Sequence, residues 1–196
     1  GLVGSEMCIR DRNKEKELID KLIDLAFAED IGDGDHTTLS CIPATAMGKS
    51  KLLIKEAGVL AGIEVAKEIF NRFDPSMKVE VFINDGTEVK PGDVAMIVEG
   101  KVQSLLQTER LMLNVMQRMS GIATMTRKYA RQLEGTHTRV LDTRKTTPGM
   151  RILEKMAVKI GGGVNHRIGL FDMILLKDNH VDFAGGIDKA INRAKD

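Results

Sequence analysis

The pattern of hydrophobic and polar positions changes part-way along the chain. In the first hundred residues, apolar side chains at helical spacing predict helices over residues 13–28 and 63–73. Residues 49–62 and 78–100 instead alternate between apolar and polar side chains and are broken by Gly, Asp-Gly and Pro-Gly turns, which predicts short strands and hairpins. Together these features indicate a mixed α+β domain.

A long helical stretch follows. Residues 101–135 are rich in Leu and Met, and their spacing predicts a helix that is interrupted near Ser120 and Gly121. Methionine fills irregular gaps in protein interiors, so we expect most of these side chains to lie in the core.

From Arg139 onward, short apolar runs alternate with helical patterns. An apolar run starts at Arg139, a helix is predicted over 150–160, residues 171–180 have the pattern of a buried strand, and another helix starts near Gly185. Such alternation is typical of parallel α/β folds. Two strands are too few to close a barrel or complete a sheet, so we interpret the chain as a segment that lacks its C-terminal part.

The first twelve residues, GLVGSEMCIRDR, do not match the rest of the chain. They lack the apolar core of a signal peptide and resemble translated sequencing-adapter read-through, so we expect residues 1–12 to be a disordered, non-native leader. Cys8 and Cys41 cannot form a disulfide framework and lack metal-ligand spacing. The cysteine content therefore favours a reduced, cytoplasmic protein.

Composition excludes several classes of partner. The 196 residues are 42% hydrophobic and 29% charged, as in ordinary globular proteins, and the formal net charge is only +1. A broad nucleic-acid or membrane surface usually needs a strong basic excess. Trp is absent and Tyr129 is the single tyrosine, so a base-stacking platform is not expected, and no apolar stretch is long enough to cross a bilayer.

Positively charged residues gather after the apolar runs of the second part. They are Arg144 and Lys145, preceded by Thr143, after the first run, His166 and Arg167 after the Gly-rich segment 161–163, and Lys177 after the second run. Ligands of parallel α/β folds bind beyond the carboxyl ends of the strands, so we expect these side chains to line one common binding crevice. A solvent-exposed run of charges could account for any one of the three clusters. It accounts poorly for three clusters that all follow apolar runs or a helix at matching positions. Clustered cations in a crevice require an anion, and Arg forks suit carboxylates or phosphates.

Other sites fit the sequence less well. The four histidines show no metal-ligand spacing, and Arg167 beside His166 would repel a cation. No phosphate-binding GxxxxGK[ST] motif occurs. The glycines 161–163 can end the preceding helix in a left-handed turn, or can let a ligand approach backbone N–H groups, and both roles stay open.

Four stretches of this sequence resemble one known family. They are EDIGDGDHTT, TERLMLNVMQRMSGIAT, DTRKTTPGMRILEKMAV and GGGVNHRIGLFDMILLKDNH. They are similar, in order and over the chain from about Leu18 onward, to quinolinate phosphoribosyltransferases. The resemblance implies an N-terminal α+β sandwich-like domain over residues 13–112. Residues 113–196 would then form the first part of an open α/β barrel of the type II phosphoribosyltransferase kind.

The resemblance also implies a reaction and its residues. The family is a pentosyltransferase family of NAD biosynthesis that joins quinolinate to phosphoribosyl pyrophosphate with Mg2+, giving nicotinate mononucleotide, pyrophosphate and CO2. Arg144 and Arg167 would hold the two carboxylates of quinolinate, and His166 and Lys177 would complete the pocket. Thr143 would add a hydroxyl or backbone contact.

Two further residues have roles that depend on the second substrate and on assembly. Lys145 would face the phosphoribosyl donor. Lys145 and Lys177 are the two expected catalytic residues. Arg110 would reach the site of a neighbouring subunit in a homodimer. The acidic Mg2+ ligands of the family are expected beyond Asp196, so no metal ligand is assigned in this chain, and we expect the segment alone not to turn over.

Three alternatives stay open. A sister phosphoribosyltransferase could act on nicotinate or another pyridine carboxylate, although the pair Arg144 and Arg167 favours a dicarboxylate. A non-catalytic anion-binding or oligomerisation module would need no further strands. A nucleic-acid binder fits the nearly neutral charge least well.

Overall fold

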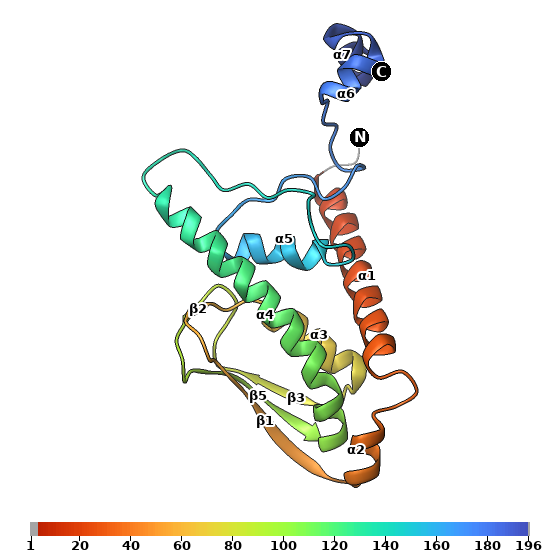
Figure 1. Ribbon diagram of the computed structural model, residues 1–196, viewed down its shortest axis with the longest axis vertical. Coiled ribbons are helices and arrows are strands. Elements are labelled where there is room, and N and C mark those ends of the chain that lie inside the picture. Colours follow the sequence, from red (N-terminus) through yellow and green to blue (C-terminus); the bar gives the residue numbers. More distant parts are fainter. Residues whose placement is uncertain (1–3, 196) are drawn as a thin grey trace.

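The computed structural model describes the backbone of residues 4–195 and the side chains of residues 14–195. In chain order its elements are α1 (Gly4–Asp30), α2 (His36–Cys41), β1 (Met47–Leu53), β2 (Gly58–Val59), α3 (Ile63–Phe73), β3 (Lys78–Val81), β4 (Glu88–Val89), β5 (Val94–Lys101), α4 (Val102–Gln132), α5 (Arg151–Ile160), α6 (Asp178–Ala184) and α7 (Ile187–Lys195). A small sheet lies at one end, α4 crosses the middle, and α6 and α7 lie at the other end, away from the body (Figure 1).

The main sheet has three antiparallel strands in the order β1–β5–β3. Met47 pairs with Lys101 and Lys78 pairs with Glu99, so β5 is hydrogen-bonded on both sides. Its Ala95, Met96 and Val98 are buried, whereas most of β1 is exposed because it forms an edge. The turns predicted at Asp-Gly and Pro-Gly are present, but the local hairpins predicted from them are not, because β3 pairs with β5 and the intervening β4 pairs with β2.

Helix α4 connects the sheet to the rest of the molecule. It follows β5 directly, and its buried side chains run along its whole length at Leu105, Met112, Val115, Met116, Met119 and Ala123. These belong to one core that also includes side chains of α1, α3, β5 and α5. Met112, Met116 and Met119 of α4 are buried, as expected for most of its methionines, whereas Met125 is 53% exposed. The expected domain boundary at residue 112 falls inside this helix and stays a prediction.

The interruption predicted near Ser120 and Gly121 is wrong, because α4 is continuous from Val102 to Gln132. Ser120 does not break the helix because its hydroxyl is used outside it: Oγ accepts from the backbone N–H of Ala61 at 3.0 Å and donates to the carbonyl of Ala61 at 3.1 Å. The hydroxyl of Thr124 likewise accepts from the N–H of Val59 at 2.8 Å. These bonds attach the β2 segment to α4.

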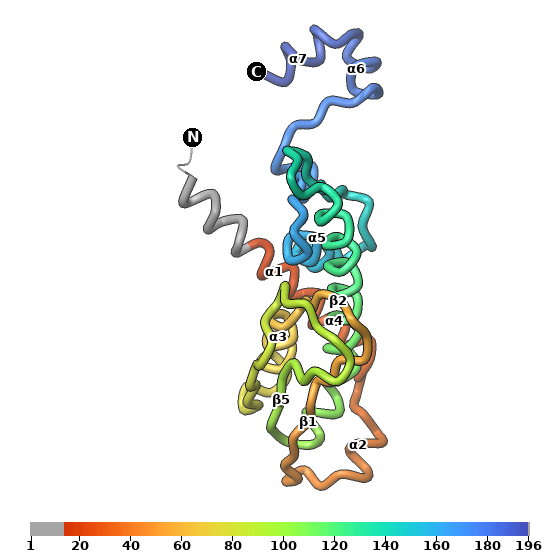
Figure 2. Tube along the Cα trace, turned by 90° about the vertical axis from the view of Figure 1, so that its left-hand side faces the viewer, coloured from red at the N-terminus to blue at the C-terminus, as the bar shows by residue number. Residues whose placement is uncertain are grey.

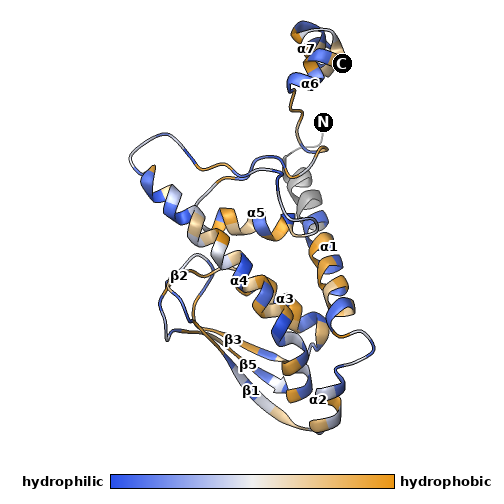
Figure 3. Cartoon of the chain, viewed as in Figure 1, coloured by the Kyte–Doolittle hydropathy of each residue, from blue (hydrophilic) through white to orange (hydrophobic). Residues whose placement is uncertain are grey.

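The predicted helix over residues 63–73 is confirmed by α3, and the alternation of apolar and polar positions on α1 and α3 is visible in Figure 3. The carboxylate of Asp85 accepts from the N–H of Ile63 at 2.9 Å at the start of α3. Burial raises the pKa of Asp85 above its ordinary value, although the N–H groups of Ile63, Gly62 and Glu64 partly oppose this shift.

Helix α1 begins at Gly4, where a disordered leader through residue 12 was expected. The helix extends this far because no Gly or Pro occurs between Gly4 and Asp30, so nothing in that stretch ends it. Residues 1–3 and the side chains of residues 1–13, Cys8 among them, lie outside the described part. The suggestion that this segment is not native stays a prediction.

The two strands predicted after residue 139 do not form as such. Near the first, one parallel bridge joins Leu141 to Val164, and residues 173–177 have no regular structure. The prediction of a buried strand over 171–180 is wrong, since Ile174 is 71% exposed. A parallel strand needs hydrogen-bonded neighbours and helices over its faces, and within the described residues this segment has neither. It leads to α6 and α7, which contact each other and project from the body in both views (Figures 1 and 2).

Helix α5 packs closely against the C-terminal half of α4. A Cβ atom added at Gly161 would lie 2.5 Å from the carbonyl oxygen of Ala123 and 2.7 Å from Cβ of Thr126. Arg127 of α4 donates from Nε to the carbonyl of Gly161 at 3.0 Å. The absence of a side chain at Gly161 therefore sets how closely the two helices approach.

We expect Gly161→Ala to destabilise the protein by about 1–3 kcal/mol, because the new methyl group has no space between the helices. Gly121→Ala is the matched control, since a Cβ there meets nothing within 4 Å and alanine is the better helix former by about 1 kcal/mol. Urea unfolding of both variants measures the two effects. A Gly161→Ala midpoint equal to or above that of Gly121→Ala would contradict the packing argument.

Candidate functional site

The Gly-rich segment 161–163 ends α5 and turns the chain back toward the body. Gly162 has φ +95°, and its N–H donates to the carbonyl of Lys159 at 3.0 Å, while the N–H of Gly163 donates to the carbonyl of Val158 at 2.9 Å. This is the left-handed Schellman ending of a helix. The helix-exit role left open by the sequence is thus observed, and the N–H groups of all three glycines are used within the protein.

After this turn, the chain runs beside residues 140–142. The N–H of Val164 donates to the carbonyl of Val140 at 2.8 Å, and the N–H of Asp142 donates to the carbonyl of Val164 at 3.1 Å. The N–H of His166 then donates to the carboxylate of Asp142 at 2.7 Å. These bonds place His166 and Arg167 next to the segment that starts with Thr143.

A buried ion pair lies beneath this junction. Nζ of Lys155, from α5, lies 2.6 Å from Oδ1 of Asp142, and the two side chains are 3% and 6% exposed. The same Nζ donates to the carbonyl of His166 at 3.0 Å. With its amide nitrogen facing the pair, Asn165 donates to Oδ2 of Asp142 and to the carbonyl of Lys155, both at 2.9 Å.

The two arginines expected to bind carboxylates have no acidic partner among the described side chains. Arg167 is only 7% exposed, and its Nη1 donates to the carbonyl of Met173 at 3.2 Å. Nε of Arg144 is buried and makes no hydrogen bond. A buried guanidinium without a carboxylate is costly, so this pair of cations is suited to an anionic ligand.

The loop that carries Arg144 is braced from both helices. Arg151 of α5 donates from Nε to the hydroxyl of Thr146 at 3.0 Å and from Nη2 to the carbonyl of Arg144 at 3.4 Å. Arg118 of α4 pairs with the carboxylate of Glu154, and it donates to the hydroxyl of Thr147 at 2.6 Å. The loop is therefore tied to both helices at several points.

Comparison with known proteins agrees with this architecture. Residues 35–120 match the family described as "Quinolinate phosphoribosyl transferase, N-terminal domain", and residues 122–196 match the corresponding C-terminal domain. The chain belongs to the quinolinate phosphoribosyltransferase family. It is 50% identical over 173 residues to "Quinolinate phosphoribosyltransferase [decarboxylating] 1b" of Nicotiana tabacum, covering 87% of this chain and 49% of that protein.

Other members and solved structures place the chain in the same family and fold. It is 44% identical to a "Probable nicotinate-nucleotide pyrophosphorylase [carboxylating]" of Synechocystis, covering 89% of this chain and 59% of that protein. The structure of NadC from Streptococcus pyogenes superimposes with a TM-score of 0.85 at 42% identity, covering 90% of this chain and 63% of that one. The α/β fold class is therefore confirmed. The chain spans about half the length of the plant relatives it matches.

Within this member of the quinolinate phosphoribosyltransferase family, the expected residues are only partly brought together. Arg144 and Arg167 lie on adjoining segments, with Thr143, Lys145 and His166 beside them. Thr143 and Lys145 are exposed, and the hydroxyl of Thr143 accepts from the N–H of Lys145 at 3.2 Å.

Lys177 and Arg110 lie apart from this cluster. Lys177 is exposed at the start of α6, where its N–H donates to Nδ1 of His180 at 3.1 Å, on the arm that leaves the body (Figure 1). Arg110 is exposed in the N-terminal third of α4, whereas α5 packs on the C-terminal half of that helix. The roles of all seven residues stay predictions.

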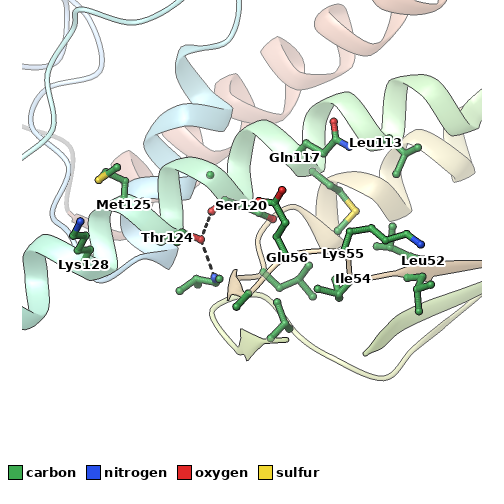
Figure 4. A pocket seen from close by; sticks show the side chains of 18 residues that line it. Leu52, Ile54, Lys55, Glu56, Leu113, Gln117, Ser120, Thr124, Met125 and Lys128 are labelled. Carbon is green, nitrogen blue, oxygen red and sulfur yellow. Dashed lines mark hydrogen bonds between the residues drawn. The ribbon is translucent and has the colours of Figure 1, made fainter. Parts of the chain in front are cut away.

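A cavity of about 510 Å³ lies elsewhere, between α4 and the segment from Leu52 to Leu60 (Figure 4). Its size suits a small molecule, but its lining is largely apolar and includes none of the expected binding residues. The hydroxyls of Ser120 and Thr124 in its wall already bond to the backbone of residues 59–61. The cationic cluster therefore stays the predicted anion site.

Two searches of the described residues bear on other classes of site. Among the side chains of residues 14–195, no group of three His, Cys, Asp or Glu residues is arranged to hold a metal ion. No helix in the described part of the chain has the length and apolarity that crossing a membrane demands.

Sequence reasoning missed the residues that hold the cluster together. Asp142 and Lys155 were not singled out, although Lys155 lies one helical turn after the buried Ile152. A lysine in that position is rarely buried without a partner, and this was the available signal. Its partner could not be identified from sequence because Asp142 lies thirteen residues away, across a loop.

Asp172 holds the turn that follows Arg167. Its carboxylate accepts from the N–H of Ile168 at 2.7 Å and from the N–H of Gly169 at 2.8 Å. Burial on its own would raise the pKa of Asp172, but the N–H groups of Gly169 and Ile168 outweigh it and hold the pKa below its ordinary value.

We therefore expect this turn to open in acid. Because the folded pKa is below the unfolded one, the charged carboxylate stabilises the turn above the unfolded pKa, and that stabilisation is lost as the pH falls through the folded pKa. The protection factors of the Ile168 and Gly169 amides, which correct for the intrinsic pH dependence of hydrogen exchange, should then fall at acidic pH. Asp172→Asn should remove this pH dependence, and unchanged protection factors in wild type would contradict the assignment.

Proposed function

We propose that this chain takes part in phosphoribosyl transfer from phosphoribosyl pyrophosphate to quinolinate with decarboxylation. The products are nicotinate mononucleotide, pyrophosphate and CO2, as in the reactions named for its relatives. The observation that carries the proposal is the pair of guanidiniums, Arg144 and Arg167, that lie on adjoining segments without acidic partners among the described side chains.

The chemistry of quinolinate suits this arrangement. The molecule carries two neighbouring carboxylates on a pyridine ring, and two Arg forks match a dianion of that shape better than one. His166, directly before Arg167 in sequence, would contact the ring or a carboxylate. Lys145 would face the phosphoribosyl donor, and Lys177 would complete the quinolinate pocket.

The reaction needs positioning and charge more than covalent help from the protein. The ring nitrogen attacks C1 of the ribosyl group as pyrophosphate leaves with the electrons of the broken bond. The pyridinium formed can accept the electron pair released when the adjacent carboxylate departs as CO2. A proton then replaces that carboxylate on the ring, so the chain itself has only to orient the diacid and stabilise its charge.

The proposal also concerns Mg2+ and the cellular compartment. We infer that Mg2+ enters with phosphoribosyl pyrophosphate, but the described residues offer it no ligand set, and no step is assigned to it. The exposed free thiol of Cys41 is compatible with a reducing compartment such as the cytoplasm. Some relatives carry the words mitochondrial or chloroplastic in their names.

A second candidate is a phosphoribosyltransferase that acts on nicotinate. The fold is compatible with it, since human nicotinic acid phosphoribosyltransferase superimposes with a TM-score of 0.57, but at 16% identity this likeness concerns the fold alone. Nicotinate has one carboxylate, so it would leave one of Arg144 and Arg167 without a partner. A non-catalytic anion-binding module is the remaining alternative, and it would bind both acids without turnover.

We expect the chain to bind quinolinate more tightly than nicotinate, and Arg144→Ala or Arg167→Ala to weaken quinolinate binding by roughly 10- to 100-fold. Each substitution removes charge-assisted hydrogen bonds to a carboxylate, worth about 1.5–3 kcal/mol. Isothermal titration calorimetry measures all four affinities. Lys159→Ala, which removes an exposed cation of α5, is the charge-matched control and should change little. Equal affinity for the two acids would contradict the substrate assignment.

We also propose a homodimer in which Arg110 completes the site of the neighbouring subunit, because Arg110 is exposed and lies apart from the cluster of its own chain. Arg110→Ala and Arg144→Ala should each bind quinolinate weakly. Mixing them and allowing subunit exchange should restore tight binding at roughly a quarter of the sites, since each hybrid dimer has one intact site. Sedimentation gives the oligomeric state. A mixture that binds quinolinate as weakly as the two separate variants would contradict the shared site.

A further inference from the structure

We propose that the buried pair Lys155–Asp142 is the positioning device of the carboxylate pocket. It would fix His166 and Arg167 beside Thr143 and Arg144 before any ligand arrives. The inference rests on the function proposed above, because it gives a role at the proposed site to two residues that are not themselves expected to bind the substrate.

The first argument is the number of chain segments that meet at this pair. Asp142 immediately precedes Thr143 and Arg144, and Lys155 comes from α5. The backbone of His166 bonds to both partners, with its N–H on Asp142 at 2.7 Å and its carbonyl on Nζ of Lys155 at 3.0 Å. One ion pair therefore holds both backbone polar groups of the residue that precedes Arg167.

The second argument is that both carboxylate oxygens of Asp142 are occupied. Oδ1 accepts from Lys155 and from the N–H of His166, and Oδ2 faces the amide nitrogen of Asn165 at 2.9 Å. This carboxylate is consequently not available to pair with Arg144, its near neighbour in sequence. Lys155 neutralises an acid that would otherwise repel an anionic substrate or bind the guanidinium meant for it.

The third argument is energetic. Burying an ion pair removes both charges from water, and a well-packed apolar pair of similar volume often stabilises a fold as well or better. Lys155 is itself 3% exposed and lies one helical turn from the buried Ile152, so an apolar side chain at this position would also be shielded from water. An ion pair at this position is therefore better explained by the orientation of His166 than by stability.

The test compares Lys155→Met, Asp142→Asn and a packing control, Leu153→Ala, in the full chain. Leu153 is 1% exposed on the same helix, so its truncation should lower the melting temperature without touching the pair. Three quantities are measured for each variant: the melting temperature, the quinolinate dissociation constant by calorimetry, and the amide proton shift of His166 by NMR. The amide shift reports the hydrogen bond to Asp142 directly, whether or not ligand is present.

We expect Lys155→Met and Asp142→Asn each to weaken quinolinate binding by roughly tenfold or more, as the loss of orienting partners does at other binding sites. Both should move the His166 amide upfield. Leu153→Ala should lower the melting temperature and leave the affinity and the amide shift unchanged.

Asp142→Asn separates positioning from electrostatics. It removes a negative charge next to the pocket, so a purely electrostatic role predicts tighter binding of the diacid, whereas a positioning role predicts weaker binding. Tighter binding, or an unchanged His166 amide in both variants, would overturn the proposal. If Lys155→Met does not fold, Asp142→Asn still decides, because it preserves shape and volume.

The result also distinguishes this proposal from the function on which it rests. Wild-type protein that fails to bind quinolinate would refute the proposed substrate, yet the His166 amide shift in the two variants would still test the positioning role. Wild-type protein that binds quinolinate, with variants that bind it equally well, would refute the positioning role alone.

Discussion

The structure depends on the packing of a single helix against two different surfaces. Helix α4 buries Met112 and Met116 toward α3 and the sheet, and Ala123 and Thr126 toward α5. Because the helix is continuous over 31 residues, the distance and angle between the sheet and α5 are set by a rigid rod. The residues of the candidate site that α5 supports are therefore positioned by the packing of α4 against α5. The lack of a side chain at Gly161 makes this packing possible.

Charge is distributed unequally around the site. Acidic and basic side chains that brace the loop are paired, as Asp142 is with Lys155 and Glu154 with Arg118. The guanidiniums of Arg144 and Arg167 are not paired with acids in the part of the chain that the structure describes. The fold thus neutralises its structural charges and leaves uncompensated the ones that an anionic ligand would need. That contrast supports a carboxylate site more strongly than the presence of basic residues alone.

Much of the architecture could be predicted from local patterns. The spacing of apolar residues was sufficient for α3 and α5, and the Asp-Gly and Pro-Gly sequences were sufficient for the turns, because both signals act over a few residues. Which strands pair was not predictable in this way, since β3 pairs with β5 and β4 pairs with β2. The strand over 171–180 could not be predicted correctly in the same way. Its apolar run is compatible with a buried strand, but whether a strand forms depends on partners that lie far away in sequence or outside the chain.

The sequence by itself determined the family, since four long motifs are properties of residue order, and it predicted an anionic ligand from paired arginines beside a histidine. Only the tertiary structure decided which of those residues meet. The bridge between Leu141 and Val164 brings together the segments that carry Arg144 and Arg167. Lys177 and Arg110 lie apart from them. The tertiary structure also revealed Lys155 and Asp142 as the link, because a buried ion pair between residues on different segments leaves no periodic signal. The physical reason is that chemistry is encoded in side-chain types, whereas proximity results from packing of the whole chain.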